Sequence, residues 1–321
     1  MPRVSVVIPC YNAADTLGEA LDSVLSQSFD DLEVIVVDDG SDDDPRAVVE
    51  ARSDPRVRHH RIPRSGAPSR PRNVGVADAR GDVVFFCDAD DVMLPGKIAK
   101  QMTVLDARPL VGMVFTDFEV IDASGNVVRP SFLARFRTLR WVAEGGTREG
   151  GGYDPGRMLR GLHRANFVGM SGVAIRRSVL RDAGGFDESL DSSEDFDLWL
   201  RVAAVTQCLH LDEPLHRYRV HRNGLMQESS ARHPLARIVV LERERNRVAD
   251  PGSRRDLGQR IGSNHFSAGW AFSNQYRFPE ARAHYRHAFR HQRSWRSLKA
   301  LVTTLPIVDR LVARIRTHLR G

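Results

Sequence analysis

The sequence has 321 residues, of which 41% are hydrophobic, 7% aromatic and 27% charged. This composition is typical of a globular protein and excludes wholesale disorder, collagen-like repeats and a disulfide-rich scaffold. The net charge of +6 is unevenly distributed, because residues 229–321 contain 19 Lys and Arg against 6 Asp and Glu, whereas residues 1–228 contain 28 against 35. The three cysteines have no metal-ligand spacing, and neither a signal peptide nor an apolar run of about 18 residues occurs, so we expect a cytoplasmic protein.

The first ninety residues alternate short apolar runs with amphipathic stretches, the pattern of a doubly wound parallel sheet whose strands are buried on both faces. Strands are predicted at 4–8, 32–37, 57–62 and 82–87, and helices at 15–26, 45–52 and 71–80. Right-handed crossovers place the carboxyl ends of such strands along one edge, where open α/β sheets bind their ligands.

The elements predicted beyond residue 91 are less regular. They are a helix at 95–107, a strand at 111–117, a hairpin at 119–128, a flexible loop or lid at 129–152, a strand at 167–175, a helix at 194–204 and a strand pair at 207–211 and 215–220. From about residue 229 the pattern is helical throughout, with one hairpin of tetratricopeptide type around Arg277-Phe278-Pro279. We therefore expect one domain over 1–228 and a basic helical region over 229–321.

Acidic residues follow two of the predicted strands. Asp38 and Asp39 precede a glycine turn and could accept a hydrogen bond from a pyrimidine imide or a ribose hydroxyl, although a plain Asp-Gly turn has the same sequence. Asp88, Asp90 and Asp91 repel one another unless a cation neutralises them, and carboxylate oxygens suit magnesium or manganese. Because the first domain is net negative, a diphosphate could dock there only through a bridging divalent ion. A solvated acidic loop is the alternative.

Other positions could also carry chemistry. Arg72, at the start of a predicted helix, could bond a base carbonyl or a phosphate, or be an exposed helical arginine. Glu194 and Asp195 fall in the first turn of a helix that the preceding serines can cap, where the helix dipole keeps a general base ionised; ordinary acidic capping would explain them too. His221 ends the last predicted strand of the domain, and a lone histidine is more often structural.

Six segments in order, VSVVIPCYN, VDDGS, PRNVG, CDADD, SEDFDLWLR and YRVH, resemble the family 2 glycosyltransferases of the GT-A fold. The resemblance implies an α/β fold, with a Rossmann-like, mostly parallel sheet, helices on both faces and an α-helical C-terminal extension. It implies a catalytic domain over 1–228 that moves a hexosyl group from a nucleotide-diphospho-sugar to an acceptor hydroxyl, with inversion. The expected cofactor is Mn²⁺ or Mg²⁺, and the expected process is bacterial cell-surface polysaccharide or glycoconjugate synthesis.

The resemblance also assigns roles to single residues. Contacts to the donor nucleotide are assigned to Pro9, Tyr11, Asp38, Asp39, Arg72 and Asp88. Contacts to the metal are assigned to Asp88, Asp90 and His221, with a secondary role for Asp91. The catalytic base is Asp195, with Glu194 in a secondary role.

Competing classes differ from this pattern at identifiable places. A Rossmann dehydrogenase needs Gly-x-Gly-x-x-Gly after the first strand, where Pro9-Cys10-Tyr11-Asn12 stands. A sugar-nucleotide pyrophosphorylase needs a basic, glycine-rich first loop, and an inactive nucleotide-sugar-binding scaffold would tolerate loss of the acidic motif. The family's processive synthases carry a Gln-x-x-Arg-Trp motif and transmembrane helices, so their absence favours single addition.

The basic C-terminal region has two interpretations. Residues 293–321 alternate apolar side chains with arginines, which predicts either a helix packed on the domain or one that lies on an anionic membrane. The second interpretation would bring the enzyme to a glycan or lipid-linked acceptor at the inner face of the cytoplasmic membrane. No aromatic-interleaved basic platform occurs, so we expect no nucleic-acid partner.

Overall fold

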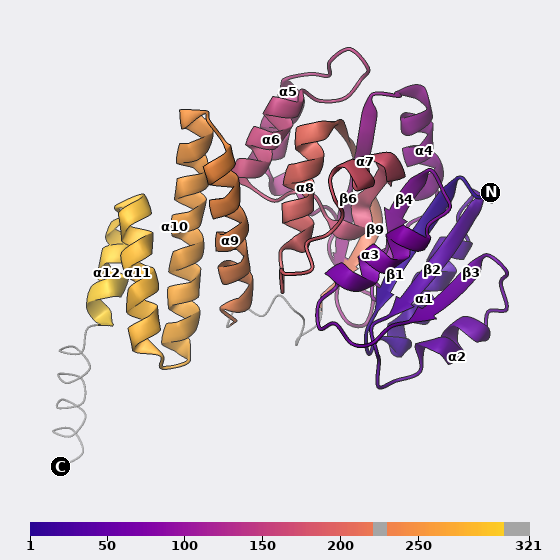
Figure 1. Cartoon of the computed structure of the whole chain (residues 1–321), viewed down its shortest axis with the longest axis horizontal. Coiled ribbons are helices and arrows are strands. Elements are labelled where there is room, and N and C mark those ends of the chain that lie inside the picture. The colour runs from indigo at the N-terminus through magenta and orange to yellow at the C-terminus, as the bar shows by residue number, and fades with distance from the viewer. Residues whose placement is uncertain (221–229, 305–321) are drawn as a thin grey trace. The chain divides into compact units, whose positions relative to one another are not determined.

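The computed structural model describes residues 1–220 and 230–304, and the chain divides into two compact units, Met1–His221 and Arg222–Gly321 (Figure 1). The predicted domain boundary at 228 lies in the stretch 221–229, outside the described residues. The described part of the first unit forms a nine-stranded sheet in the order β3-β2-β1-β4-β8-β6-β9-β5, with β7 beside β6. Each unit is described by itself below.

The N-terminal half of the sheet is parallel, as the alternation of strands and helices predicts. Its strands are β1 (Val4–Cys10), β2 (Leu32–Asp38), β3 (Val57–Arg61) and β4 (Val83–Phe86). Every residue of β1, β2 and β4 is buried, which explains their continuous apolar sequence. The carboxyl ends of β1, β2 and β4 therefore lie at one edge.

Helices connect these strands and pack on them. They are α1 (Ala14–Leu25), α2 (Pro45–Glu50) and α3 (Ser69–Asp78). The buried side of α1 carries Leu17, Leu21 and Val24, the spacing of an amphipathic helix. α3 approaches β1 so closely that a Cβ on Gly75 would lie 2.3 Å from a methyl carbon of Val7, so glycine is required there.

The C-terminal half of the sheet is mixed. Its strands are β5 (Val92–Met93), β6 (Val111–Ile121), β7 (Val127–Arg129), β8 (Val173–Arg176) and β9 (Gln207–Arg219). β8 is antiparallel to both β4 and β6, β9 is parallel to β6, and β7 forms the predicted hairpin with β6. The remaining elements of this unit are α4 (Lys97–Ala107), η1 (Leu133–Arg135), α5 (Arg137–Glu144), α6 (Pro155–Arg164), η2 (Met170–Gly172), α7 (Arg177–Asp182) and α8 (Glu194–Val205).

Several predicted elements differ from the observed ones. The strand predicted at 167–175 is only β8, from Val173 to Arg176, and the 3-10 helix η2 precedes it. The strand pair at 207–211 and 215–220 is a single strand, β9, which passes Pro214 with a shift of register against β6 at Thr116 and Asp117. Proline has no N–H for the sheet, and a bulge accommodates it. The predicted lid at 129–152 contains η1 and α5; α5 buries only Leu139 and Val142, too short an apolar pattern to reveal a helix.

The second unit is helical, as predicted. Its described helices are α9 (Arg232–Arg247), α10 (Pro251–Asn274), α11 (Phe278–Gln292) and α12 (Trp295–Thr303). α10 and α11 form a hairpin that turns at Arg277, and their buried contact includes Ala268, Phe272, Ala281 and Tyr285. Within 1–220 and 230–304, no helix combines the length and the apolar character needed to span a bilayer.

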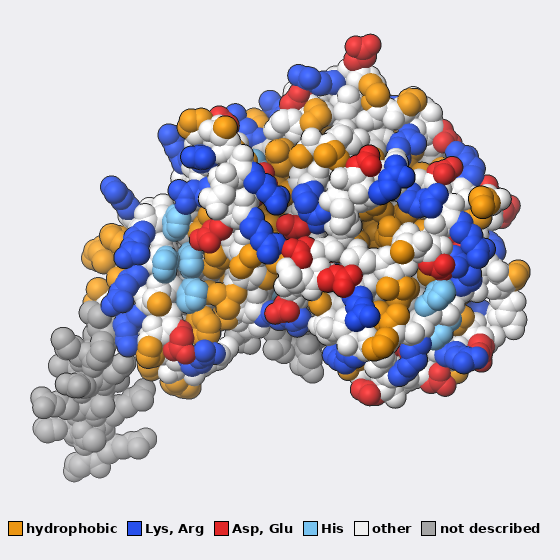
Figure 2. Space-filling view, viewed as in Figure 1, with side chains coloured by type: hydrophobic (Ala, Val, Ile, Leu, Met, Phe, Trp, Pro, Cys, Tyr) orange, Lys and Arg blue, Asp and Glu red, His pale blue; other side chains and the backbone are white. Residues whose placement is uncertain are grey.

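Histidine side chains gather on the second unit in the view of Figure 2. His265 of α10 lies with its Nδ1 2.9 Å from Nδ1 of His284, and its ring stacks on His287 at 4.7 Å. Burial, followed by repulsion from its histidine neighbours, lowers the pKa of His265 to about 3. The contact between α10 and α11 therefore holds a neutral imidazole at neutral pH.

A lysine lies inside the core of the first unit. Lys97 is 0% exposed; its Nζ donates a hydrogen bond to Oε1 of Gln101 at 2.7 Å and lies 4.9 Å from the ring centroid of Phe85. Gln101 in turn donates to the backbone oxygens of Val114 and Gly172. Burial lowers the pKa of Lys97 to about 7, because the charged form loses its hydration.

Replacing Lys97 by Met should flatten the pH dependence of stability. Because the pKa is about 7 in the folded state and near 10.5 in the unfolded state, the unfolded chain binds more protons between these values, and the free energy of unfolding should rise with pH across that window. The slope is at most about 1.4 kcal/mol per pH unit. Denaturant unfolding from pH 6 to 10 measures it.

Lys100→Met is the matched control, because Lys100 lies on the same helix but is exposed and paired with Glu213. This variant should keep the slope of the unmodified protein. Parallel pH profiles for Lys97→Met and the unmodified protein would contradict the assignment of the slope to Lys97.

Candidate functional site

The acidic pair after β2 holds neighbouring loops in place. Asp38 is buried and accepts a hydrogen bond from Nη1 of Arg61 at 2.7 Å. Asp39 accepts the backbone N–H groups of Ser65 and Gly66, at 2.8 and 3.2 Å. Both carboxylates thus lie at the predicted edge of the sheet.

An aromatic ring from the end of β1 lies at the same edge. Tyr11 is 38% exposed, and the guanidinium carbon of Arg64 lies 3.3 Å from its ring centroid. Gly40 allows this approach, because it adopts φ +73° and a Cβ there would lie 2.9 Å from the backbone nitrogen of Arg64. Pro9 is buried within β1, opposite Val37 of β2. The structure therefore gathers the four residues assigned to the base and nucleoside, Pro9, Tyr11, Asp38 and Asp39.

Arg72 joins the two halves of the site. Its Nη2 donates to Oδ1 of Asp88 at 2.7 Å, and its Nη1 donates to Oε1 of Glu194 at 2.6 Å. Burial by itself would lower the pKa of Arg72, but Asp88 and Glu194 outweigh it and raise the pKa above its usual value. The guanidinium thus connects the end of β4 to the start of α8, and a contact between Arg72 and a base stays a prediction.

Asp91 anchors the acidic motif to two other segments. Its Oδ2 accepts the hydroxyl of Ser171 at 2.6 Å and its Oδ1 accepts the backbone N–H of Arg219 at 3.1 Å. The Ser171 oxygen accepts the backbone N–H of Asp88 at 3.0 Å. Burial, followed by the charges of Asp90 and Asp88, raises the pKa of Asp91 well above its usual value. Its predicted share in metal binding is not tested by these contacts.

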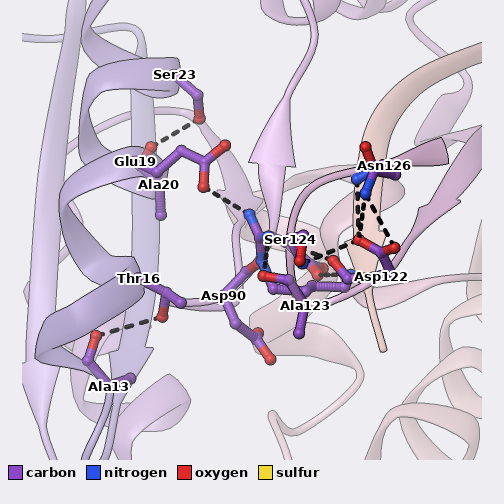
Figure 3. Close-up of polar contacts among 12 residues, drawn as sticks. Ala13, Thr16, Glu19, Ala20, Ser23, Asp90, Asp122, Ala123, Ser124 and Asn126 are labelled. Carbon is purple, nitrogen blue, oxygen red and sulfur yellow. Dashed lines mark hydrogen bonds and ion pairs between the residues drawn. The ribbon is translucent and has the colours of Figure 1, made fainter. Parts of the chain in front are cut away.

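The side chain of Arg219 clamps the backbone next to Asp91. It is buried, and it donates to the backbone oxygen of Asp90 at 3.0 Å, to Oε2 of Glu19 at 2.5 Å and to the backbone oxygen of Ala123 at 3.4 Å. Figure 3 shows these partners around one point, with the Asp90 carboxylate directed away from Glu19. The clamp fixes the backbone of Asp90.

Tyr218 lies on β9 next to Arg219, whose backbone N–H binds Asp91. Burial raises the pKa of Tyr218 above its usual range, and the charges of Asp91, Asp88, Asp90 and Asp195 raise it further, in that order. A single hydroxyl group therefore lies close to the acidic motif and to the predicted base. The motifs assign Tyr218 no role, although its alternation with His216 along the strand places both side chains on the same face of the sheet.

Asp195 lies in the first turn of α8. It is half-buried; its Oδ1 accepts the backbone N–H of Phe196 at 2.6 Å and its Oδ2 lies 3.4 Å from Nδ2 of Asn166. The expected serine cap is absent: Ser193 occupies the N-cap position in the left-handed region, φ 62°, with no side-chain cap hydrogen bond. Such a conformation costs about 1–3 kcal/mol in a residue other than glycine and is found mostly at functional sites.

The acidic motif fits a metal site in which the protein supplies one or two carboxylates and the phosphates of a bound substrate supply the other ligands. Among residues 1–220 and 230–304, no three or more His, Cys, Asp or Glu side chains are grouped so that they could hold an ion. Mg²⁺ is commonly bound through one or two carboxylates and the phosphates of a substrate, and Asp88 and Asp90 supply such carboxylates. Asp88 is part-exposed, with 27% of its side chain accessible, and Asp90 is half-buried. His221, the third predicted ligand, lies outside the described residues.

Comparisons with known proteins agree with this geometry. The model of glycosyl transferase family 2 matches residues 5–183. The succinoglycan biosynthesis protein ExoO of Rhizobium meliloti is 32% identical over 211 residues, which are 65% of this chain and 57% of ExoO. The O-antigen biosynthesis protein RfbC of Myxococcus xanthus is 29% identical over 223 residues, 68% of this chain but 16% of RfbC. The matched region is thus only part of each relative.

Solved structures share the fold at low sequence identity. TarS 1-349 of S. aureus aligns with a TM-score of 0.63 and 20% identity, over 91% of this chain and 81% of that one. The mannosyltransferase PcManGT of Pyrobaculum calidifontis, solved with GDP-Man and Mn²⁺, aligns with a TM-score of 0.62 and 21% identity, over 94% of this chain and 79% of that one. Since the family model covers more than half of the chain, the protein is a glycosyltransferase of family 2, with the mixed α/β GT-A fold that its motifs predict.

Proposed function

We propose that the first unit transfers a sugar from a nucleotide-diphospho-sugar to an acceptor hydroxyl with inversion, in the synthesis of a cell-surface polysaccharide or glycoconjugate. The observation that carries the proposal is the position of Arg72, which ties Asp88 of the acidic motif to Glu194, the neighbour of Asp195. This contact supports the proposal that the acidic motif and the predicted base belong to one site. The relatives in succinoglycan and O-antigen biosynthesis support the process.

The donor nucleotide would bind at the ends of β1 and β2. Tyr11 offers a ring for stacking, and Asp38 and Asp39 offer acceptors beside it, with Pro9 as the wall. A nucleotide base could stack on either face of the Tyr11 ring. On one face it would displace the Arg64 guanidinium, and on the other the ring would lie between the base and Arg64. The TarS and PcManGT structures contain UDP-GlcNAc and GDP-Man, which supports a donor of this class.

A divalent ion would bind beside the diphosphate. Asp90 and Asp88 would hold Mn²⁺ or Mg²⁺, with Asp91 behind them and His221 as a predicted third ligand. Such an ion neutralises the charge that develops on a leaving diphosphate. The carboxylates near Tyr218 repel one another, so they favour a cation at this position.

Asp195 would act as the general base. It removes the proton of the acceptor hydroxyl while that oxygen attacks the anomeric carbon; the bond from this carbon to the diphosphate oxygen breaks, and the nucleoside diphosphate leaves. One displacement inverts the configuration. Glu194 is bonded to Arg72, whereas Asp195 is half-buried in the first turn of α8, where the helix dipole favours a negative charge.

Residues 293–304 are the described part of the segment that the membrane interpretation concerns. Residues 305–321 lie outside the described residues, and in α12 Trp295 is 76% exposed. We propose a cytoplasmic enzyme whose glycan or lipid-linked acceptor lies at the inner face of the membrane. An exposed tryptophan next to arginines would suit an anionic lipid surface.

Asp195→Asn should lower the turnover number about 10² to 10⁴-fold and leave donor affinity nearly unchanged, because general base catalysis contributes about that factor. The measurements are sugar transfer and donor binding by calorimetry. Asp182→Asn is the control, since Asp182 is an exposed carboxylate on α7. Transfer at the unmodified rate by the Asp195 variant would show that another group is the base.

Asp90→Ala should abolish the part of donor affinity that depends on Mn²⁺. Calorimetry with UDP-GlcNAc and GDP-Man, with Mn²⁺ and with a chelator, measures this difference. Asp106→Ala, which removes an exposed carboxylate paired with Arg3, should keep it. Undiminished affinity without metal, in both the variant and the unmodified protein, would overturn the metal role.

A further inference from the structure

An aromatic platform leads away from the carboxylates of the site. The ring of Phe118, on β6, lies 5.9 Å from the ring of Tyr218, and Phe132 stacks on Phe118 with centroids 4.5 Å apart. Phe136 lies a further 5.6 Å from Phe132. Aromatic faces of this kind accommodate the apolar faces of sugar rings and of other flat or chain-like groups. The platform therefore runs from Tyr218 to Phe136, the residue that precedes α5.

The platform is held rigidly to the sheet. The Asp117 carboxylate on β6 accepts the backbone N–H groups of Phe118, Phe132 and Leu133 on one oxygen, at 2.7, 3.1 and 2.8 Å. Its other oxygen accepts the hydroxyl of Ser131. A buried carboxylate with this many donors fixes the segment before η1, so Phe132 keeps its place relative to β6.

Two guanidinium groups flank the exposed end of this platform. The guanidinium carbon of Arg135 lies 3.9 Å from the Phe132 centroid, and that of Arg129 lies 5.6 Å from it. Within the described residues, neither arginine forms an ion pair with a carboxylate. Burial, followed by the charge of Arg129, lowers the pKa of Arg135. Two positive charges therefore lie beside the Phe132 ring, and no carboxylate of residues 1–220 or 230–304 pairs with either.

The segment around these two arginines is also positively charged. Residues 129–164 contain 8 Arg against 3 Asp and Glu, whereas the other residues of 1–220 contain 19 Lys and Arg against 31 Asp and Glu. A negatively charged acceptor would be repelled by most of this unit and attracted by this segment. Planar guanidinium groups bind carboxylate and phosphate oxygens in a bidentate manner.

We infer that Arg129 and Arg135, beside Phe132, form an acceptor subsite for an anionic sugar or sugar phosphate. The inference rests on the proposed function, because it names the class of acceptor for that site. The hydroxyl to be glycosylated would face Asp195 and Tyr218, and the oxyanion of the same acceptor would lie on the two arginines. Carboxylate and phosphate share this chemistry, and the test separates them.

The test uses the full chain with three acceptor probes: a glucose-terminated oligosaccharide, the same oligosaccharide ending in glucuronic acid, and a glycerol phosphate oligomer. Hydrolysis of the donor without acceptor is measured first, with a panel of uridine and guanosine diphosphate sugars. At least one anionic probe should bind more tightly than the neutral one by about 10- to 100-fold in calorimetry, since hydrogen bonds to charged groups contribute about that factor. Salt should reduce this preference.

The double variant Arg129→Gln/Arg135→Gln should lose the preference for the anionic probe and keep the rate of donor hydrolysis. Arg137→Gln is the matched control, because Arg137 is an exposed arginine of the same segment and stacks on no ring among the described residues. Arg129→Lys/Arg135→Lys, which keeps the charge, should retain part of the preference. Melting curves establish that each variant is folded.

The outcomes separate the two proposals. A double variant that binds anionic and neutral probes like the unmodified protein would overturn the subsite, whatever the donor hydrolysis. Equal binding of all three probes by the unmodified protein would overturn it as well. The unmodified protein could also fail to hydrolyse any donor and still prefer an anionic probe, with the double variant losing this preference. That result would support the subsite and count against the proposed transfer reaction.

Discussion

The ion pairs of Arg72 are the constraint on which both halves of the site depend. Its guanidinium is buried between Asp88 and Glu194, which come from segments 16 and 122 residues away in the sequence. Breaking a buried pair leaves an uncompensated charge and typically costs about 3–5 kcal/mol. The end of β4 and the start of α8 therefore cannot shift independently. Because Asp195 follows Glu194 directly, the same interaction sets the place of the predicted base relative to the acidic motif.

The carboxylates of the acidic motif and of the α8 N-terminus have different environments, which reduces their mutual repulsion. Asp91 is buried and has a raised pKa. It accepts hydrogen bonds from the Ser171 hydroxyl and the Arg219 backbone N–H, so it holds these two segments together. Glu194 is neutralised by Arg72, whereas Asp90 and Asp195 are half-buried. Environments that differ this much allow neighbouring carboxylates to play different roles in one reaction. The structure thus shows different environments for these acids where the sequence shows only a cluster.

The strand ends and the acidic motifs could be predicted because they depend on local pattern. Apolar runs identify β1, β2 and β4, and parallel topology then places Asp38, Asp39 and Asp88 at one edge. The hydrogen bonds from Ser171 and Arg219 to Asp91 could not be predicted. These residues are 80 and 128 positions from Asp91 in the sequence, and no periodicity encodes such contacts. The left-handed Ser193 was missed for a related reason: serine is a common helix cap, and tertiary contacts overrode that preference.

An irregularity between β6 and β9 lies next to the aromatic platform. The register between these strands shifts on both sides of Asp117, where β9 passes Pro214. A bulge re-aims the side chain that it contains, and here the Asp117 carboxylate turns to bind the backbone of Phe132 and Leu133. Farther along the same strand, β9 carries Tyr218 next to the carboxylates. The proline that made β9 look like two strands thus lies at the bulge that holds the aromatic platform in register with the reacting groups.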